Sequence, residues 1–269
     1  MLIGITPNAI GADCINPVLF NPATLFTGGL KGVWYDPSDL NSMFQDAAGT
    51  IPVTADNDPI GLIKDKSGNN AHASQATAAK RPKYRTGAGR PYIEFDGTQT
   101  FFSTSAINAT AYSVMSAVIG AYKADGTVRQ SFEFSPDSPT NNGSFSHPPG
   151  SGGANNWGVG LKGTLGIIST SAAVGVPPTT TVNTCLYALG AASDQARLRV
   201  NGVQVATTGA GNTGAGPFGN HSLYIGSRAG TSLFFLGRIY QLIIVSKTLA
   251  GAELTNAEKH VANKTGVTL

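Results

Sequence analysis

The sequence predicts an all-β protein, a jelly-roll β-sandwich with an N-terminal extension and a short C-terminal helix. Only 12% of the 269 residues are charged, whereas the chain contains 34 Gly and 15 Pro, a composition typical of many short strands joined by turns. From residue 91 onward, strand-like runs alternate with Gly, Asn and Asp turn signals. Because no linker-like break follows residue 91, one domain is favoured over two smaller β domains.

Residues 1–30 form the N-terminal extension. They are nearly uncharged, rich in Gly and Asn-Pro, and show no regular strand or helix period. An apolar segment of this kind is unfavourable in water, so we predict a docking arm that binds a neighbouring chain. The predicted sandwich domain comprises residues 31–269. The alternative to a docking arm is an ordinary N-terminal strand that packs on this domain. The apolar side chains predicted to dock are Leu2, Ile3, Ile5, Ile10, Ile15, Val18, Leu19, Phe20, Leu25 and Phe26.

The segment 31–90 carries a helix signal and an uneven charge. In "WYDPSDLNSMF", Asp36 can cap a short helix that has Pro37 at its first position. Residues 64–90 contain seven Lys and Arg against one Asp, whereas residues 1–63 contain six Asp and one Lys. The basic segment is either a solvated loop or a patch that meets an acidic neighbour, such as another subunit.

The clearest strand signal is the hairpin "ARLRVNGVQVATT". A type I′ turn needs positive φ at both central residues, and Asn201-Gly202 is the dipeptide that meets this need. Strand alternation then points Leu198 into the core. Cys185 lies in the apolar run "TVNTCLYALGAA" and is predicted to be a core residue. Cys14 and Cys185 are the two cysteines of the chain and lie far apart in sequence, so they form no disulfide framework or metal cluster, and both are predicted to be free.

The chain ends in a predicted helix, "LAGAELTNAEKHVANKTG". Gly266 can close this helix, because glycine adopts the left-handed conformation at a helix C-terminus. His260 is expected at its surface. The apolar stripe that would pack on the sandwich consists of Ala250, Leu254, Ala257 and Val261.

Charge and hydropathy exclude several kinds of partner. The net charge of +3 gives no strong attraction to nucleic acid. No stretch approaches the ~18 apolar residues of a membrane span. The N-terminus lacks the basic start and continuous apolar run of a secretory signal. We therefore expect a soluble protein, made in a cytoplasm, that binds neither nucleic acid nor membrane.

The second half of the chain resembles the laminin-G-like, concanavalin A-like sandwich family. "ARLRVNGVQVATT", "SLYIGSRAG" and "FFLGRIYQLIIVSKTLAGAELTNAEKHV" follow the order of that family's "VNG" hairpin, "YIG" strand, "G-x-I-x-x-L-x-I" strand and helix start. "YIEFDGTQTFFST" is similar to its "FDG" strand and turn. The resemblance covers roughly residues 91–265 and implies a laminin-G-like jelly roll as the sandwich core over 91–269.

The first half resembles the opening of bacteriophage and prophage structural proteins that carry this sandwich. The pattern "WYDPSDL", "FQD", "GTIPVT", "DKSGNNAHASQ" and "RP" lies within residues 30–90. The resemblance implies a location on a virion, as a capsid decoration, head fibre or tail fibre component. Other virion proteins would be its partners, together with further copies of the chain, for which trimers are common among phage fibres.

A pair of carboxylates in "RPYIEFDGTQTFF" raises the question of catalysis. Glu94 and Asp96 lie two positions apart in a strand and would share one face. The resemblance includes glucanases with an E-x-D-x-x-E motif, but the third carboxylate position here is Gln99. Glu94 and Asp96 therefore lack the second partner that general acid/base work needs. We predict that the protein is not an enzyme and that Asp96 holds a turn.

The candidate ligand-binding residues lie mainly in the loop 136–157. Sugar sites combine an aromatic face with amide or carboxylate hydrogen bonds, and long loops on β scaffolds often carry function. The alternative for Trp157 is packing under its own loop. No cofactor is predicted, although calcium is kept as an alternative ligand for Asp96. The candidates are Asp96, Asn141, Asn142, His147, Asn155, Asn156 and Trp157.

Two functions from different classes follow from these features. The first is a non-enzymatic virion surface protein that attaches through its N-terminal arm and subunit contacts. The alternative is a carbohydrate-binding adhesin module that recognises bacterial surface glycans. A glycosidase is the third and weakest hypothesis, because His72, His147, His221 and His260 have no nucleophile at motif spacing.

Overall fold

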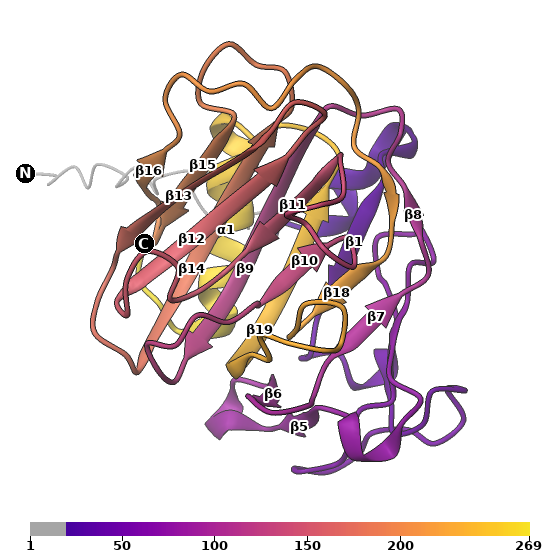
Figure 1. Cartoon of the computed structure of the whole chain (residues 1–269). Coiled ribbons are helices and arrows are strands. Elements are labelled where there is room, and N and C mark those ends of the chain that lie inside the picture. Colours follow the sequence, from indigo (N-terminus) through magenta and orange to yellow (C-terminus); the bar gives the residue numbers. More distant parts are fainter. Residues whose placement is uncertain (1–19) are drawn as a thin grey trace, which may run out of the picture.

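Two antiparallel sheets pack face to face in the computed structural model, which describes residues 20–269 (Figure 1). Sheet A has the strand order β16-β15-β14-β9-β19-β6-β5, with β1 also paired to β19. Its strands are β1 (Gly32–Tyr35), β5 (Lys83–Arg85), β6 (Tyr92–Asp96), β9 (Val114–Lys123), β14 (Thr179–Ala188), β15 (Ala196–Val200), β16 (Val203–Thr207) and β19 (Leu236–Val245).

Sheet B has the order β13-β12-β11-β10-β18-β7-β4-β3-β2. Its strands are β2 (Met43–Phe44), β3 (Leu62–Ile63), β4 (Ala73–Ser74), β7 (Phe102–Thr104), β10 (Phe132–Phe134), β11 (Ser144–His147), β12 (Asn156–Lys162), β13 (Ile167–Ala173) and β18 (Leu223–Ile225). A small third sheet pairs β8 (Ile107–Asn108) with β17 (Asn220–His221). The predicted all-β sandwich is confirmed.

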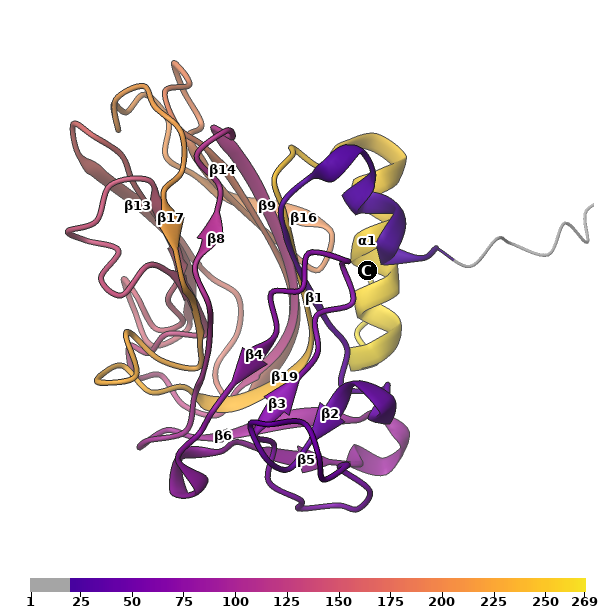
Figure 2. The ribbon, with the colours of Figure 1, turned by 90° about the vertical axis from the view of Figure 1, so that its right-hand side faces the viewer.

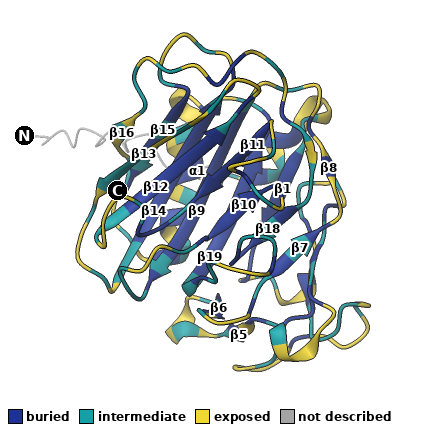
Figure 3. Cartoon of the chain, viewed as in Figure 1, coloured by how far each residue is buried: buried dark blue, intermediate teal, exposed yellow. Residues whose placement is uncertain are grey.

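The main core lies between the two sheets, where the central strands such as β9, β11 and β19 are mostly buried and the edge strands β13 and β16 are more exposed (Figure 3). β6 shows the alternation that builds it. Ile93 and Phe95 point into the core, whereas Glu94 is half exposed on the outer face of sheet A. The predicted hairpin is also present, with φ of 49° at Asn201 and 80° at Gly202. Cys185 is fully buried in β14, as expected.

Helix α1 (Gly251–Thr265) covers the outer face of sheet A and forms a third layer (Figure 2). Its C-terminus closes at Gly266, whose φ of 77° is left-handed, as predicted. A second apolar cluster fills the space between α1 and the sheet, and Val261 is one of its fully buried members. No helix among residues 20–269 has the length and apolar character that a membrane-spanning helix requires.

His260 is not the surface residue that the sequence predicted. Its ring makes edge contacts with Phe20 and Trp34, at centroid distances of 5.9 Å and 6.5 Å. Burial lowers its pKa below the ordinary value. The prediction failed because the neighbours of His260 come from the other end of the chain, and local helix periodicity does not reveal them.

The described part of the predicted docking arm packs on its own domain. Residues 22–29 form the 3-10 helix η1 (Pro22–Gly29), which begins at the capping residue Asn21. Leu25 is 0% exposed and Phe26 8% exposed, and both belong to the cluster under α1. Phe20 is half-buried against the same cluster. The expectation that Leu25 and Phe26 bind another chain is therefore wrong, because their apolar surface is already buried inside this one.

The other predicted docking side chains lie outside the described residues. They are Leu2, Ile3, Ile5, Ile10, Ile15, Val18 and Leu19, and their docking role stays a prediction.

The predicted short helix after Trp34 begins three residues later than expected. The 3-10 helix η2 (Leu40–Ser42) is capped by Asp39, whose side chain accepts a hydrogen bond from the Asn41 N–H. Asp36 instead accepts hydrogen bonds from the backbone N–H and the hydroxyl of Ser38. The short segment holds two Asp-led turns in succession, and the sequence does not say which of them starts the helix. Two further 3-10 turns, η3 (Ala78–Lys80) and η4 (Gly87–Gly89), flank β5.

Candidate functional site

The predicted ligand-binding loop 136–157 is divided by a strand. β11 (Ser144–His147) runs through its middle and pairs with both β10 and β12. All four residues of β11 are buried. A Ser-rich run between Pro and Gly turns carries little strand signal, so the sequence predicted one long loop where the chain forms a central strand of sheet B.

Trp157 and His147 are buried inside the sandwich and cannot offer a surface to a ligand. Both are 0% exposed, and their rings stack at a centroid distance of 5.0 Å. Lys123 lies over the Trp157 ring at 5.5 Å and donates hydrogen bonds to the carbonyls of Ala154 and Asn156. The prediction of these two rings as ligand contacts is wrong, and the alternative reading, in which Trp157 packs under its own loop, is the one observed.

The four predicted asparagines do not form one site. Asn142 lies two residues before β11, where its carbonyl contacts His221 Nε2 at 2.9 Å and its side chain accepts a hydrogen bond from Lys162. Asn141 precedes it and donates to the Ser135 hydroxyl. Asn155 and Asn156 lie at the far end of the β11–β12 pair, roughly 20 Å along the strands. The structure thus separates the asparagines into two pairs, with no shared cavity.

Asp96 holds a turn, as predicted. Its Oδ1 accepts hydrogen bonds from the backbone N–H groups of Thr98, Gln99 and Thr100 and from the Thr100 hydroxyl, at 2.9–3.1 Å. These donors stabilise the carboxylate over the cost of partial burial and lower its pKa to about 2. Asp96 is therefore ionised at neutral pH and is no proton donor. Gly97 takes a φ of 74° in this turn.

A charged cleft lies beside Asp96, on the outward faces of β5 and β6, and we name it the β5–β6 cleft. Its volume is about 600 Å³. η3 and the turn after β6 form its walls. It is lined by Asn57, Pro59, Ala78, Ala79, Arg81, Lys83, Arg85, Glu94, Phe95, Asp96, Gln99, Thr100 and Leu236.

Hydrogen bonds and ion pairs hold the polar groups of the cleft in place. Arg85 lies between two carboxylates, at 2.9 Å from Glu94 and 3.1 Å from Asp56. Arg81 donates from Nε and Nη2 to the carbonyls of Gln75 and Ala76. The cleft therefore presents fixed donors and acceptors side by side.

Aromatic rings adjoin the cleft on the same face of sheet A. Arg238 lies opposite Glu94 on β19, and Tyr122 of β9 lies opposite Arg238. The Arg238 guanidinium packs over the rings of Tyr122 and Tyr92, at 4.3 Å and 4.7 Å. This surface continues the cleft across three neighbouring strands.

Both carboxylates that line the cleft are engaged by neighbouring groups. Glu94 is ion-paired with Arg85, and Asp96 is committed to its turn. The third position of the glucanase-like motif, Gln99, lines the cleft but carries an amide. Within residues 20–269, no three His, Cys, Asp or Glu side chains gather as a metal site would require.

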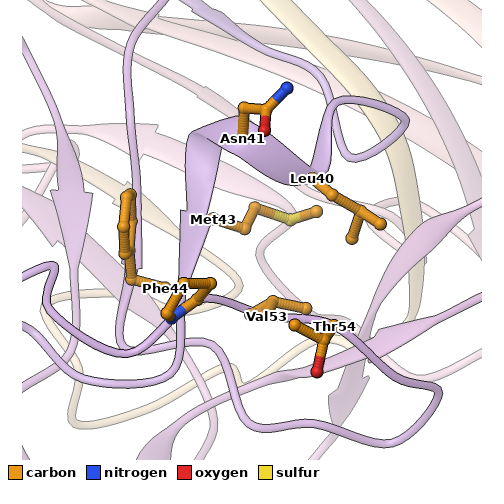
Figure 4. Close-up of a pocket in the computed structure, with 7 residues that line it drawn as sticks. Leu40, Asn41, Met43, Phe44, Val53 and Thr54 are labelled. Carbon is orange, nitrogen blue, oxygen red and sulfur yellow. The ribbon is translucent and has the colours of Figure 1, made fainter.

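A second hollow is more apolar. It lies between η2, β2 and the segment 52–54, and its volume is about 360 Å³. Figure 4 shows the side chains of Leu40, Met43 and Val53 gathered around it, with Asn41 pointing away. It offers few hydrogen-bonding groups, so the β5–β6 cleft is the stronger candidate for a polar ligand.

Sequence reasoning missed most of this site. Arg81, Lys83 and Arg85 belong to the basic segment 64–90, and their charge was the one available signal. The sequence pattern around Glu94 indicates only a possible catalytic role for that residue. Arg238 has no signal in "FFLGRIYQLIIVS", because its aromatic neighbours come from β6 and β9.

No protein-family model matches the chain, and no curated protein matches it in sequence. Solved structures share its fold at low identity. A GH54 α-L-arabinofuranosidase superposes with a TM-score of 0.60 at 12% identity, over 91% of this chain and 66% of that one. The binding domain of Paraclostridial Mosquitocidal Protein 1 has a TM-score of 0.54 at 14% identity, over 76% and 49%.

Botulinum neurotoxin type C, which depends on interaction with two ganglioside molecules to enter cells, has a TM-score of 0.58 at 13% identity, over 86% of this chain and 51% of that one. The chain thus spans about half the length of the toxin structures. At these identities the likeness shows the fold alone. Because the fold occurs in binding domains and in a glycosidase, it does not decide between binding and catalysis.

Proposed function

We propose that the protein is a carbohydrate-binding module and that it holds a glycan in the β5–β6 cleft. Sugar hydroxyl groups both donate and accept hydrogen bonds, so a sugar site needs both kinds of partner close together. The cleft provides donors on Arg81, Lys83 and Arg85 and acceptors on Glu94 and Gln99. This convergence of fixed polar groups in one open cleft is the observation that carries the proposal.

The neighbouring aromatic surface supports the same function. Tyr122 is half exposed beside Arg238, on the face that the cleft occupies. Aromatic rings pack against the apolar faces of sugars, while polar groups set their orientation. The similarity to a neurotoxin that interacts with gangliosides and to an arabinofuranosidase agrees with a fold suited to sugar ligands.

A glycan microarray probed with the labelled chain tests this proposal. We expect binding to a defined set of glycans, reduced on the order of tenfold by Gln99→Ala, because one hydrogen-bonding group is lost. The control is Lys259→Met on the exposed side of α1, which should leave binding unchanged. A blank array would overturn the function, and binding that ignores Gln99→Ala would overturn the site.

The proposed module binds its glycan without cleaving it. Release of reducing ends from a bound glycan, measured over hours and abolished by Glu94→Gln, would contradict this part. The virion location implied by the phage resemblance stays a prediction, since none of the compared structures bears on it. A bacterial surface glycan remains our proposed source of the ligand.

A further inference from the structure

We propose that the glycan held by the β5–β6 cleft is anionic and that its negatively charged groups bind Arg81, Lys83 and Arg238. This inference rests on the proposed function and adds the chemical class of the ligand. A carboxylated or a sulfated sugar would supply the same interaction with these cations.

The carboxylates of the cleft are already engaged. Glu94 is bound by Arg85, which also binds Asp56. Asp96 accepts four hydrogen bonds from its own turn. Hydrogen bonds do not cancel charge, so Asp56, Glu94 and Asp96 offset three of the four cations Arg81, Lys83, Arg85 and Arg238. This face therefore keeps one positive charge in excess.

Arg81, Lys83 and Arg238 have no acidic partner. Arg81 donates to two backbone carbonyls, and Lys83 donates to the side-chain oxygen of Asn57 at 3.0 Å. None of the three cations forms a salt bridge with a carboxylate of residues 20–269. Neutral groups hold these three side chains in position, so their cationic groups can bind an external anion.

The two arginines are held in place before any ligand arrives. Tyr92 and Tyr122 hold the guanidinium of Arg238, and the carbonyls hold that of Arg81. Ordering a long side chain on binding costs free energy, and cations that are already ordered avoid much of that cost. A planar guanidinium also presents paired N–H donors that match a carboxylate or sulfate.

The spacing of the cations favours an oligosaccharide over a single sugar. Lys83 pairs with Glu94, and Glu94 pairs with Arg238, so one strand separates the two cations. The Lys83 and Arg238 backbones are thus roughly 10 Å apart. A chain with charged groups on successive sugar residues can reach both, whereas one charged residue binds one of them.

The test compares three probes that differ in charge. These are a galacturonic acid hexamer, its fully methyl-esterified form, and a sulfated galactan oligomer, each titrated into the full chain by calorimetry. We expect an anionic probe to bind on the order of tenfold more tightly than the neutral ester. Its affinity should fall as salt rises, because exposed charges are screened. The two anionic probes distinguish a carboxylate ligand from a sulfate ligand.

Variants at the cleft give the second measurement. Lys83→Met and Arg238→Gln should each weaken the anionic probe on the order of tenfold, with less effect on the neutral ester. Lys259→Met is the matched control. It also removes one positive charge, but from the exposed side of α1 and not from the residues of the proposed site. Circular dichroism confirms that each variant is folded.

Each outcome decides the inference. Equal affinity for the neutral ester and the anionic probes overturns the anionic ligand and leaves the carbohydrate-binding proposal intact. If Lys259→Met loses as much affinity as Lys83→Met, the local site is overturned, because the net charge of the protein would then explain the binding. No binding of these probes, together with a blank glycan microarray, overturns both proposals.

Discussion

Arg199 of β15 donates to both carboxylate oxygens of Glu258 of α1, with Nε at 2.7 Å from Oε1 and Nη2 at 3.1 Å from Oε2. Glu258 is only 3% exposed and also accepts a hydrogen bond from Thr184 of β14. The ion pair to β15 and the hydrogen bond from β14 together join the helix to two strands of sheet A at a buried position.

Arg199→Ala should lower the free energy of unfolding by about 3 kcal/mol, because the buried Glu258 carboxylate would lose its cationic partner and keep only the hydrogen bond from Thr184. Urea denaturation measures the loss. The control is Lys247→Ala, which breaks the exposed Lys247–Glu253 pair and should cost less than about 1 kcal/mol. Similar small losses in both variants would show that the buried Arg199–Glu258 pair contributes no more to stability than the exposed pair.

Trp157→Ala should destabilise the protein by about 3–5 kcal/mol, because it opens a large cavity in the core. The milder Trp157→Phe should stay folded at 25 °C and keep the glycan affinity of the unmodified chain. Calorimetric melting and glycan titration measure the two effects. Loss of glycan binding in a folded Trp157→Phe variant would restore the ligand role that burial argues against.

His147 should make the protein less stable as pH falls below 6.5. Burial lowers the pKa of His147 to about 3 in the folded chain. Below pH 6.5 the unfolded chain therefore binds a proton at His147, whereas the folded chain does not. The stability that depends on neutral His147 is therefore complete above pH 6.5. Between pH 6.5 and pH 3 the free energy of unfolding declines by about 1.4 kcal/mol per pH unit.

His147→Phe preserves the stacking on Trp157 and Phe132 and removes this titration. The Ser131 hydroxyl stays satisfied, because it also donates to the His147 carbonyl. Melting temperatures of the two proteins, measured from pH 7 to pH 4, should diverge as the pH falls. Parallel curves would contradict the assignment.

Asp96→Ala should destabilise the turn after β6 by about 1–2 kcal/mol, because three backbone N–H groups lose their acceptor. Asp96→Asn keeps an acceptor oxygen and should cost less. The pKa of Asp96 is lowered to about 2, so its stabilisation is complete above about pH 4 and is lost as pH falls toward 2. Acid titration of stability should show this loss in the unmodified chain and not in Asp96→Asn.

Local signals predicted the elements with a strong pattern. The Asn201-Gly202 hairpin, the buried strand around Cys185 and the C-terminal helix closed by Gly266 are all present. Each depends on backbone preferences or periodicity within a few residues. β11 was missed because its four residues are strand only by virtue of pairing with β10 and β12.

The candidate site could not be read in the same way. Its basic residues were visible as a charged segment, but nothing in the chain said that Glu94, Gln99 and Arg238 would join them. The prediction that His147 and Trp157 of a long polar loop bind a ligand was wrong. Whether a side chain is exposed depends on which other segments of the chain pack over it.

Composition and short-range pattern were enough to specify the β-sandwich, its hairpin and its terminal helix, because these depend on turn chemistry and on the alternation of apolar residues. The packed chain alone decided which charges stay unpaired, which rings are buried, and that Leu25 and Phe26 serve their own core. Pairing of β5, β6, β19 and β9 unites residues up to about 150 positions apart, and contacts at that separation leave no periodic trace in a single sequence.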